Sequence, residues 1–106
     1  MAKFLIKASY TADGTKGLLK EGGSGRRTAV QKLVQGMGGS VEAFYYAYGE
    51  HDVYIICDLP DAASAISISL TVNASGAVKA STVPLISPEE IDAATKKSPG
   101  YRAPGA

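Results

Sequence analysis

Residues 21–52, which read EGGSGRRTAVQKLVQGMGGSVEAFYYAYGEHD, decide the fold of this chain. A glycine-rich segment leads into an amphipathic helix predicted for about residues 25–36, with Ser24 at the position of its N-cap. Gly38 and Gly39 end the helix, and a strand rich in tyrosine follows. The helix carries one apolar stripe at helical spacing, formed by Ala29, Val30, Leu33, Val34 and Met37.

The segments before and after this stretch predict the remaining strands and helices. Alternating patterns predict strands at residues 3–10, 40–48, 53–59 and 78–86. Residues 62–73 contain the β-branched run ISISLTV, but Asp61 can cap a helix there and the alanines favour one, so a helix is predicted. A last short helix is predicted to begin at Pro88, with Ser87 as its cap.

The element order βαββαβ, with a further terminal helix, predicts a ferredoxin-like α+β fold. In that fold a four-stranded antiparallel sheet carries two helices on one face. The strand at 53–59 is the most apolar and should be central, whereas Pro84 suits an edge strand. A single domain is expected over residues 1–97, and residues 98–106 are expected to form a flexible tail.

The sheet face without helices is predicted to be rich in aromatic and aliphatic side chains. Strict alternation assigns to it Phe44, Tyr46, Tyr54 and Ile56 together, which is too much apolar surface to leave in water. We therefore expect a second copy of the chain to cover this face. The predicted assembly is a homodimer or a higher homo-oligomer in which two sheets form a dimeric α/β barrel.

Composition excludes several classes of protein. The net charge is +1, so no bulk field draws the chain to nucleic acid or to an anionic membrane, and neither partner is expected. One cysteine and one histidine cannot build a metal cluster, and no metal or other cofactor is expected. No stretch is long and apolar enough for a membrane span or a signal peptide, and a cytoplasmic location is predicted.

Short motifs spread over about residues 3–95 point to one known family. Beyond the opening strand they are Tyr10-Thr11 with Gly14, the run GLLKEGGS at 17–24, Arg27, Ala29-Val30, Leu33, Gly38-Gly39, the turn after Tyr48, DLP at 58–60 and VNASG at 72–76. With these motifs the chain resembles the GYD-domain family of the dimeric α/β-barrel superfamily. The family's Gly-x-Tyr-Asp signature stands here as Gly49-Glu50-His51-Asp52, with histidine in place of tyrosine.

The resemblance implies the ferredoxin-like fold and a homo-oligomer. It implies no particular activity, because related barrels include cofactor-independent oxygenases, isomerases, haem enzymes and effector-binding modules. The chemistry therefore has to be argued from individual residues.

The helix start at Ser24, Arg26 and Arg27 is one candidate site. Free backbone N–H groups and two guanidinium groups there could bind an anion. Cations in a first helical turn oppose the helix dipole, so they call for an acidic partner. The alternative to a ligand is an ion pair with Glu21, Asp13 or a neighbouring subunit.

The uncovered sheet face supplies the second candidate site. Lys7, Tyr46, Tyr54 and Asp58 are predicted to line a small polar pocket in the barrel between the two sheet faces, with Lys7 close to Asp58. Asp58 and Lys7 are the candidate catalytic residues, although none is assigned. Tyrosines on a sheet face also serve as packing and interface residues, which is the alternative interpretation.

Two single residues are weaker candidates. His51 beside Asp52 could suggest a general base, but a histidine in a hairpin turn is expected to be exposed at the surface. Cys57 lies in the apolar run VYIICDL, where a buried and unreactive thiol is expected.

Two function classes follow. The first is a homo-oligomeric protein that binds a small molecule or is associated with stress. The alternative is a cofactor-independent enzyme, of the isomerase or monooxygenase type, acting on a small aromatic or carbonyl compound.

Overall fold

Four strands and three helices follow one another in the order predicted. The structure, a computed structural model, describes residues 1–106. The elements are β1 (Ala2–Tyr10), α1 (Ala12–Gly36), β2 (Ser40–Tyr46), β3 (Val53–Leu59), α2 (Ala62–Ala74), β4 (Val78–Leu85) and α3 (Pro88–Thr95). The strands form one antiparallel sheet of order β2-β3-β1-β4. This confirms the ferredoxin-like α+β fold, the central position of β3 and the edge position of β4.

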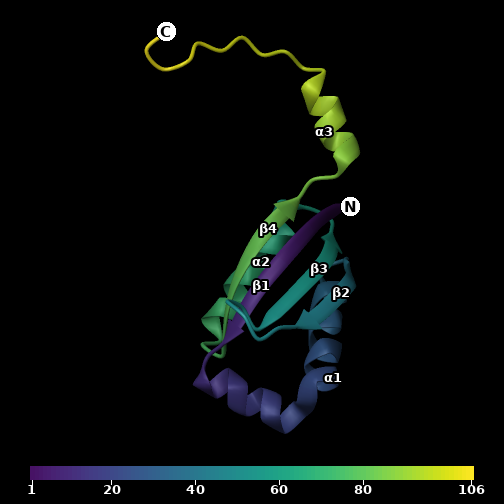
Figure 1. The fold of residues 1–106 in the computed structure, drawn as a ribbon. Coiled ribbons are helices and arrows are strands. Elements are labelled where there is room, and N and C mark those ends of the chain that lie inside the picture. The colour runs from purple at the N-terminus through teal and green to yellow at the C-terminus, as the bar shows by residue number, and fades with distance from the viewer.

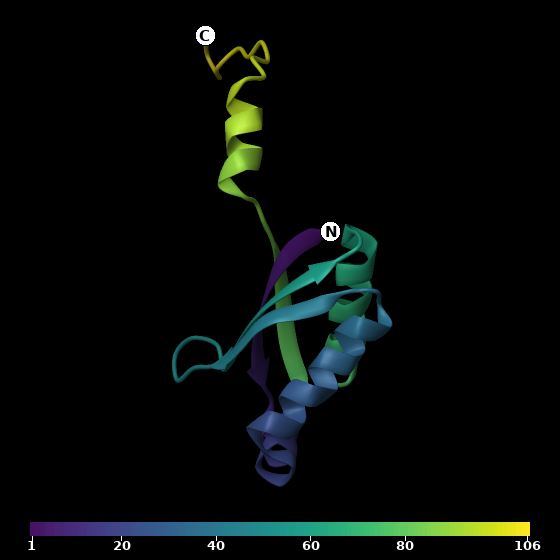
Figure 2. The same cartoon turned by 90° about the vertical axis from the view of Figure 1, so that its right-hand side faces the viewer.

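Helices α1 and α2 lie on the same face of the sheet, as the two views in Figures 1 and 2 show. The core lies between them and the sheet. Its largest contribution comes from alternate residues of the two central strands, Phe4, Ile6 and Ala8 of β1 and Val53, Ile55, Cys57 and Leu59 of β3. Val34 of α1 and Ile68 of α2 complete the core on the helix side. The face of β3 predicted to point toward the helices does so.

Strand β2 departs from simple alternation. A β-bulge between Val41 and Ala43 places one extra residue in the strand, and an extra residue reverses the faces of the residues beyond it. Phe44 is consequently paired with Ile55, and Tyr46 with Val53, both on the helix side. The prediction that Phe44 and Tyr46 lie on the uncovered face is therefore wrong.

Helix α1 is bent at Gly22, and it begins earlier than predicted. Thr11 caps it, with the Thr11 side chain accepting a hydrogen bond from the backbone N–H of Gly14. Gly22 has φ 78° and ψ 166°, a region open almost only to glycine, so the helix breaks there into two segments. Ser24, predicted as an N-cap, lies within the second segment, because the break falls two residues before it.

The capping residues predicted for the other helices are confirmed. Asp61 caps α2 by accepting hydrogen bonds from the backbone N–H and the hydroxyl of Ser64, which also lower the pKa of its carboxyl group. Ser87 and Glu90 form a reciprocal capping box at the start of α3, where Pro88 occupies the first turn.

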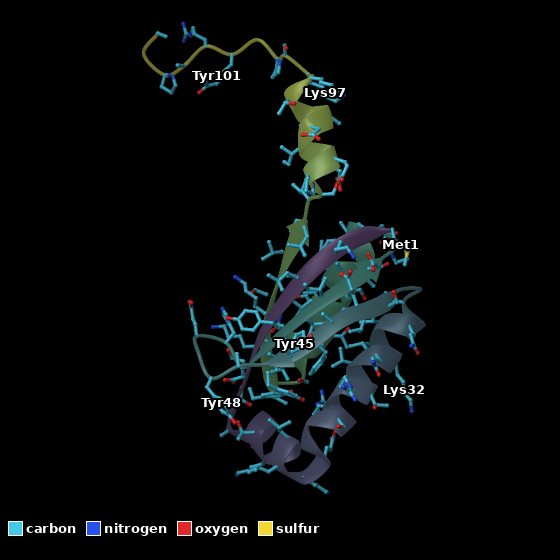
Figure 3. All side chains as sticks on the ribbon, turned by 45° about the vertical axis from the view of Figure 1, so that its right-hand side comes forward. Met1, Lys32, Tyr45, Tyr48, Lys97 and Tyr101 are labelled. Carbon is cyan, nitrogen blue, oxygen red and sulfur yellow. The ribbon has the colours of Figure 1, made fainter.

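Helix α3 stands away from the sheet and the other helices (Figures 1 and 2). All of its residues are exposed, as are residues 98–106, which form no helix or strand. Figure 3 shows Lys97 at the end of this helix and Tyr101 in the segment beyond it. The domain limit at residue 97 stays a prediction. None of the helices is both long enough and apolar enough to cross a bilayer.

Candidate functional site

The uncovered face of the sheet carries a cluster of three charges at one end. The ammonium group of Lys3 lies 3.0 Å from the carboxylate of Asp58 and 2.9 Å from that of Glu42. These contacts, Glu42 first, raise the pKa of Lys3. Lys3 is the direct cross-strand partner of Asp58, whereas Lys7 is paired with Tyr54. The prediction that Lys7 approaches Asp58 is wrong, because the strand register brings Lys3 there instead.

The other predicted pocket residues are spread over both faces of the sheet. Lys7, Tyr54 and Tyr45 share one row across the uncovered face, because Tyr54 is paired with both neighbours. Figure 3 shows the side chain of Tyr45, which is 71% exposed, at the surface of β2. Lys7, Tyr54 and Asp58 line none of the five principal pockets of the single chain. A pocket on this face would need a second chain to close it.

Tyr46 lies on the helix side, next to the bend in α1. Its hydroxyl donates a hydrogen bond of 3.0 Å to the carbonyl oxygen of Gly23. Partial desolvation of Tyr46, which is 40% exposed, is the main cause that raises its pKa to about 12; the neighbouring Tyr10 adds a smaller effect, and Arg26 and Arg27 act in the opposite direction. A phenol with that pKa stays protonated at neutral pH, so Tyr46 is a hydrogen-bond donor there.

The hairpin between β2 and β3 is joined to the end of β1. The carboxylate of Asp52 accepts a hydrogen bond of 2.9 Å from the backbone N–H of Tyr10, and the backbone N–H of Asp52 donates to the carbonyl of Ala8. His51, expected to be exposed, is half-buried, with its ring edge-on to Tyr54 and its Nδ1 3.5 Å from the hydroxyl of Ser9. Asp52 therefore joins the β2–β3 hairpin to the end of β1 through hydrogen bonds to the backbone of Tyr10 and Ala8.

Arg26 and Arg27 have different surroundings. The guanidinium group of Arg26 lies 3.5 Å from the carboxylate of Glu21, which confirms that an acidic partner stands beside it. Arg27 is exposed and lines a shallow groove with Gln31 and residues of β2. Anion binding at Ser24, Arg26 and Arg27 stays a prediction.

The most apolar pocket lies between the sheet and the two helices, on the side that the sequence did not indicate. It has a volume of about 100 Å³, and 14 of its 17 lining residues are hydrophobic. Its lining includes Ala8 and Ala80, which are direct partners on β1 and β4, and Ala29 of α1. Alanine is small, so these three positions leave space that larger side chains would fill. Alanines within apolar strands were the available signal for it.

Two polar groups stand out in this cavity. The hydroxyl of Thr82 in β4 is buried and is the one buried side-chain polar atom without a hydrogen-bond partner. Arg26 is the one charged residue of the lining, and it also lines a second hollow of about 360 Å³ toward Asp13 and Glu21. The two hollows share Tyr10, Arg26, Val72 and Val78, so we name the outer one the vestibule of the cavity.

Cys57 and the acidic residues add no further site. The thiol of Cys57 is buried, which raises its pKa, with the nearby charge of Asp58 as a smaller cause. No group of three side chains suited to hold a metal ion is present in the chain.

Comparison with known proteins identifies a family for this chain. No curated protein and no solved structure matches it. The family model of the GYD domain matches residues 4–95, a range that covers all three helices and all four strands except the first two residues of β1. The chain belongs to the GYD-domain family.

Proposed function

We propose that this GYD-domain protein is a homo-oligomer that binds a small, mainly apolar molecule. The observation that carries the proposal is the cavity of about 100 Å³ between the sheet, α1 and α2, with its apolar lining. Protein cores are normally packed without voids larger than a water molecule, so a hollow of this size inside a small domain has a cost in stability. Ligand binding explains why the chain retains it.

We propose a binding site on the helix side of the sheet, because the apolar cavity of the single chain lies there. Of the four residues predicted to line a pocket between two sheet faces, Tyr46 points to the helix side, and Lys7, Tyr54 and Asp58 line none of the five principal pockets of the single chain. The cavity lining contains no carboxylate, histidine or thiol, so it offers no obvious general base. This composition supports binding over the alternative of a cofactor-independent enzyme.

The oligomer is proposed from the uncovered sheet face. One row across it consists of Val83, Leu5, Ile56 and Ala43, all direct cross-strand partners, and Tyr45 and Tyr54 lie in the next row. A second copy of the same face would remove these side chains from water.

Binding is tested by NMR titration of the full-length protein with benzyl alcohol as a neutral probe. Saturable shifts confined to the amide and methyl signals of Ala8, Val53 and Val72 are expected. Ala80→Leu, or Ala29→Leu from the helix side, should fill the hollow and abolish them. Shifts scattered over the surface, or shifts that persist in both filled variants, would contradict the proposal.

Oligomerisation is tested separately by light scattering on a chromatographic peak. The wild-type chain should elute with at least twice the mass of one subunit. Val83→Lys, on the uncovered face, should reduce that mass to one subunit. Leu70→Lys, at a position that is also exposed but lies on α2, is the matched control and should leave the mass unchanged. A wild-type monomer at micromolar concentration would exclude the sheet-to-sheet assembly.

A further inference from the structure

We infer that the cavity binds a small aromatic carboxylic acid that carries a hydroxyl group at its far end. Arg26 would hold the carboxylate at the mouth of the cavity, and Thr82 would bond the hydroxyl inside it. This inference rests on the proposed function and adds to it the chemical class of the ligand.

Arg26 is the anchor for the acid group because its donors are not saturated. The nearest carboxylate oxygen, on Glu21, is 3.5 Å away, whereas a charge-assisted hydrogen bond spans roughly 2.7–2.9 Å. A guanidinium group has five N–H donors and suits two oxygens of one carboxylate. The side chain of Arg26 is only 29% exposed, which strengthens its interaction with an anion relative to a fully solvated arginine.

The acidic residues of the vestibule are the groups that compete with the carboxylate of the ligand for Arg26. Asp13 and Glu21 both line this outer hollow, and neither lines the cavity itself. An acid that reaches Arg26 from the cavity therefore replaces Glu21 as the partner of the guanidinium group. A cationic ligand would meet the positive charge of Arg26 inside an apolar space, so the lining disfavours a cation.

Thr82 provides the second polar contact. Its hydroxyl is buried and without a partner, which is unfavourable in a folded protein. Thr82 lines the cavity but not the vestibule, whereas Arg26 lines both, so Arg26 is the one of the two that borders the outer hollow. A hydroxyl or carbonyl group at the inner end of the ligand would satisfy it.

The volume and the lining residues of the cavity determine which apolar group of a ligand fits inside it. An engineered apolar cavity of about 150 Å³ in another protein binds benzene, whereas the hollow here has about 100 Å³, so the acid group of a ligand with one ring would extend toward the vestibule, with which the cavity shares four lining residues. Phe44, Val53 and Ile55 line it on the sheet side, and Val30 and Leu33 on the side of α1. A single aromatic ring suits these walls.

The test is calorimetric titration of the full-length protein with three probes: 4-hydroxybenzoate, benzoate and 4-hydroxybenzyl alcohol. The acids should bind more tightly than the alcohol. Arg26→Gln should lower the affinity for 4-hydroxybenzoate by about tenfold or more, because a charged hydrogen-bonded pair is lost. The same variant should leave the affinity for the alcohol unchanged. Arg27→Gln is the matched control, since Arg27 lines neither hollow, and it should bind as the wild type does.

Two further variants test the two ends of the ligand. Glu21→Gln removes the competitor of the ligand and should raise the affinity for both acids. Thr82→Val should lower the affinity for 4-hydroxybenzoate and leave the affinity for benzoate little changed. The same variant should unfold at a higher temperature than the wild type, because it removes a buried hydroxyl that has no partner; this rise would show that it folds.

The outcomes separate this inference from the function on which it rests. If the alcohol binds as well as the acids and Arg26→Gln changes nothing, the ligand is not an acid, although the cavity still binds small molecules. If Thr82→Val weakens benzoate and 4-hydroxybenzoate equally, the inner hydroxyl contact is wrong. If none of the probes binds to the wild-type protein, both the inference and the proposed binding function fail.

Discussion

The hydroxyl of Tyr46 donates a hydrogen bond of 3.0 Å to the carbonyl oxygen of Gly23, and so joins β2 to the bend of α1. The acceptor is the residue directly after Gly22, where the helix breaks. The charge of Arg26, which lines both the cavity and the vestibule, acts on the Tyr46 hydroxyl. This contact thus holds the second segment of α1 in place over the sheet.

Tyr46→Phe should lower the free energy of unfolding by about 0.5–1.5 kcal/mol, because it removes one hydrogen bond and keeps the ring. Tyr45→Phe is the matched control, since that side chain is 71% exposed and makes no side-chain hydrogen bond. The control should change stability by no more than about 0.5 kcal/mol. Denaturant unfolding of both variants measures the difference, and equal losses would contradict a structural role for the Tyr46 hydroxyl.

The raised pKa of Tyr46 predicts a loss of stability at alkaline pH. Its pKa is about 12 in the folded chain against the ordinary value of 10.0, so the folded state holds this proton more tightly than the unfolded state. Its contribution is fully present below pH 10 and is lost as the pH rises from 10 toward 12. Unfolding free energies measured across this window should fall less steeply in Tyr46→Phe. An unchanged slope would show that Tyr46 titrates normally.

Gly14→Ala should destabilise the fold strongly. A Cβ at this position would overlap the backbone carbonyl of Ala77, which also accepts a hydrogen bond of 3.0 Å from the N–H of Thr11. Gly17→Ala is the control on the same helix segment, where a Cβ meets nothing within 4 Å. Gly17→Ala should stabilise the protein by roughly 0.5–1 kcal/mol, since alanine is the better helix former. Thermal unfolding should therefore move in opposite directions for the two variants, and a shared direction would refute the close packing at Gly14.

Asp52→Ala should lower the free energy of unfolding by about 1–3 kcal/mol, because the half-buried backbone N–H of Tyr10 loses its carboxylate acceptor. Glu50→Ala, in the exposed part of the same turn, should stay within about 0.5 kcal/mol of the wild type. Amide hydrogen exchange gives a local measure, since the N–H of Tyr10 should exchange faster in the Asp52 variant only. Unchanged protection would mean that this hydrogen bond contributes little.

Most of the fold could be predicted from the sequence because it depends on local patterns. Strand β3 alternates Val53, Ile55, Cys57 and Leu59, which are buried, with Tyr54, Ile56 and Asp58, which are half-buried, as the side-chain period of two of a strand predicts. Asp61 and Ser87 stand where a helix needs a side-chain acceptor, so they mark helix starts even where β-branched residues favour a strand. Of the motifs that resemble the GYD-domain family, residues 58–60 span the end of β3 and residues 72–76 span the end of α2.

The candidate site depended on tertiary structure. Apolar and aromatic residues stand at both alternating sets of positions in β2, so alternation could not reveal the bulge that turns Phe44 and Tyr46 toward the helices. Strand register, set by hydrogen bonds between residues far apart in sequence, brings Lys3 to Asp58 in place of Lys7. The lining of the cavity combines Ala8 and Ala80, which come from strands far apart in the sequence, with Ala29 of a helix. Local sequence therefore determined which elements form and which side of β3 is buried, whereas their packing decided the pocket, because a void is a property of facing surfaces and not of any one segment.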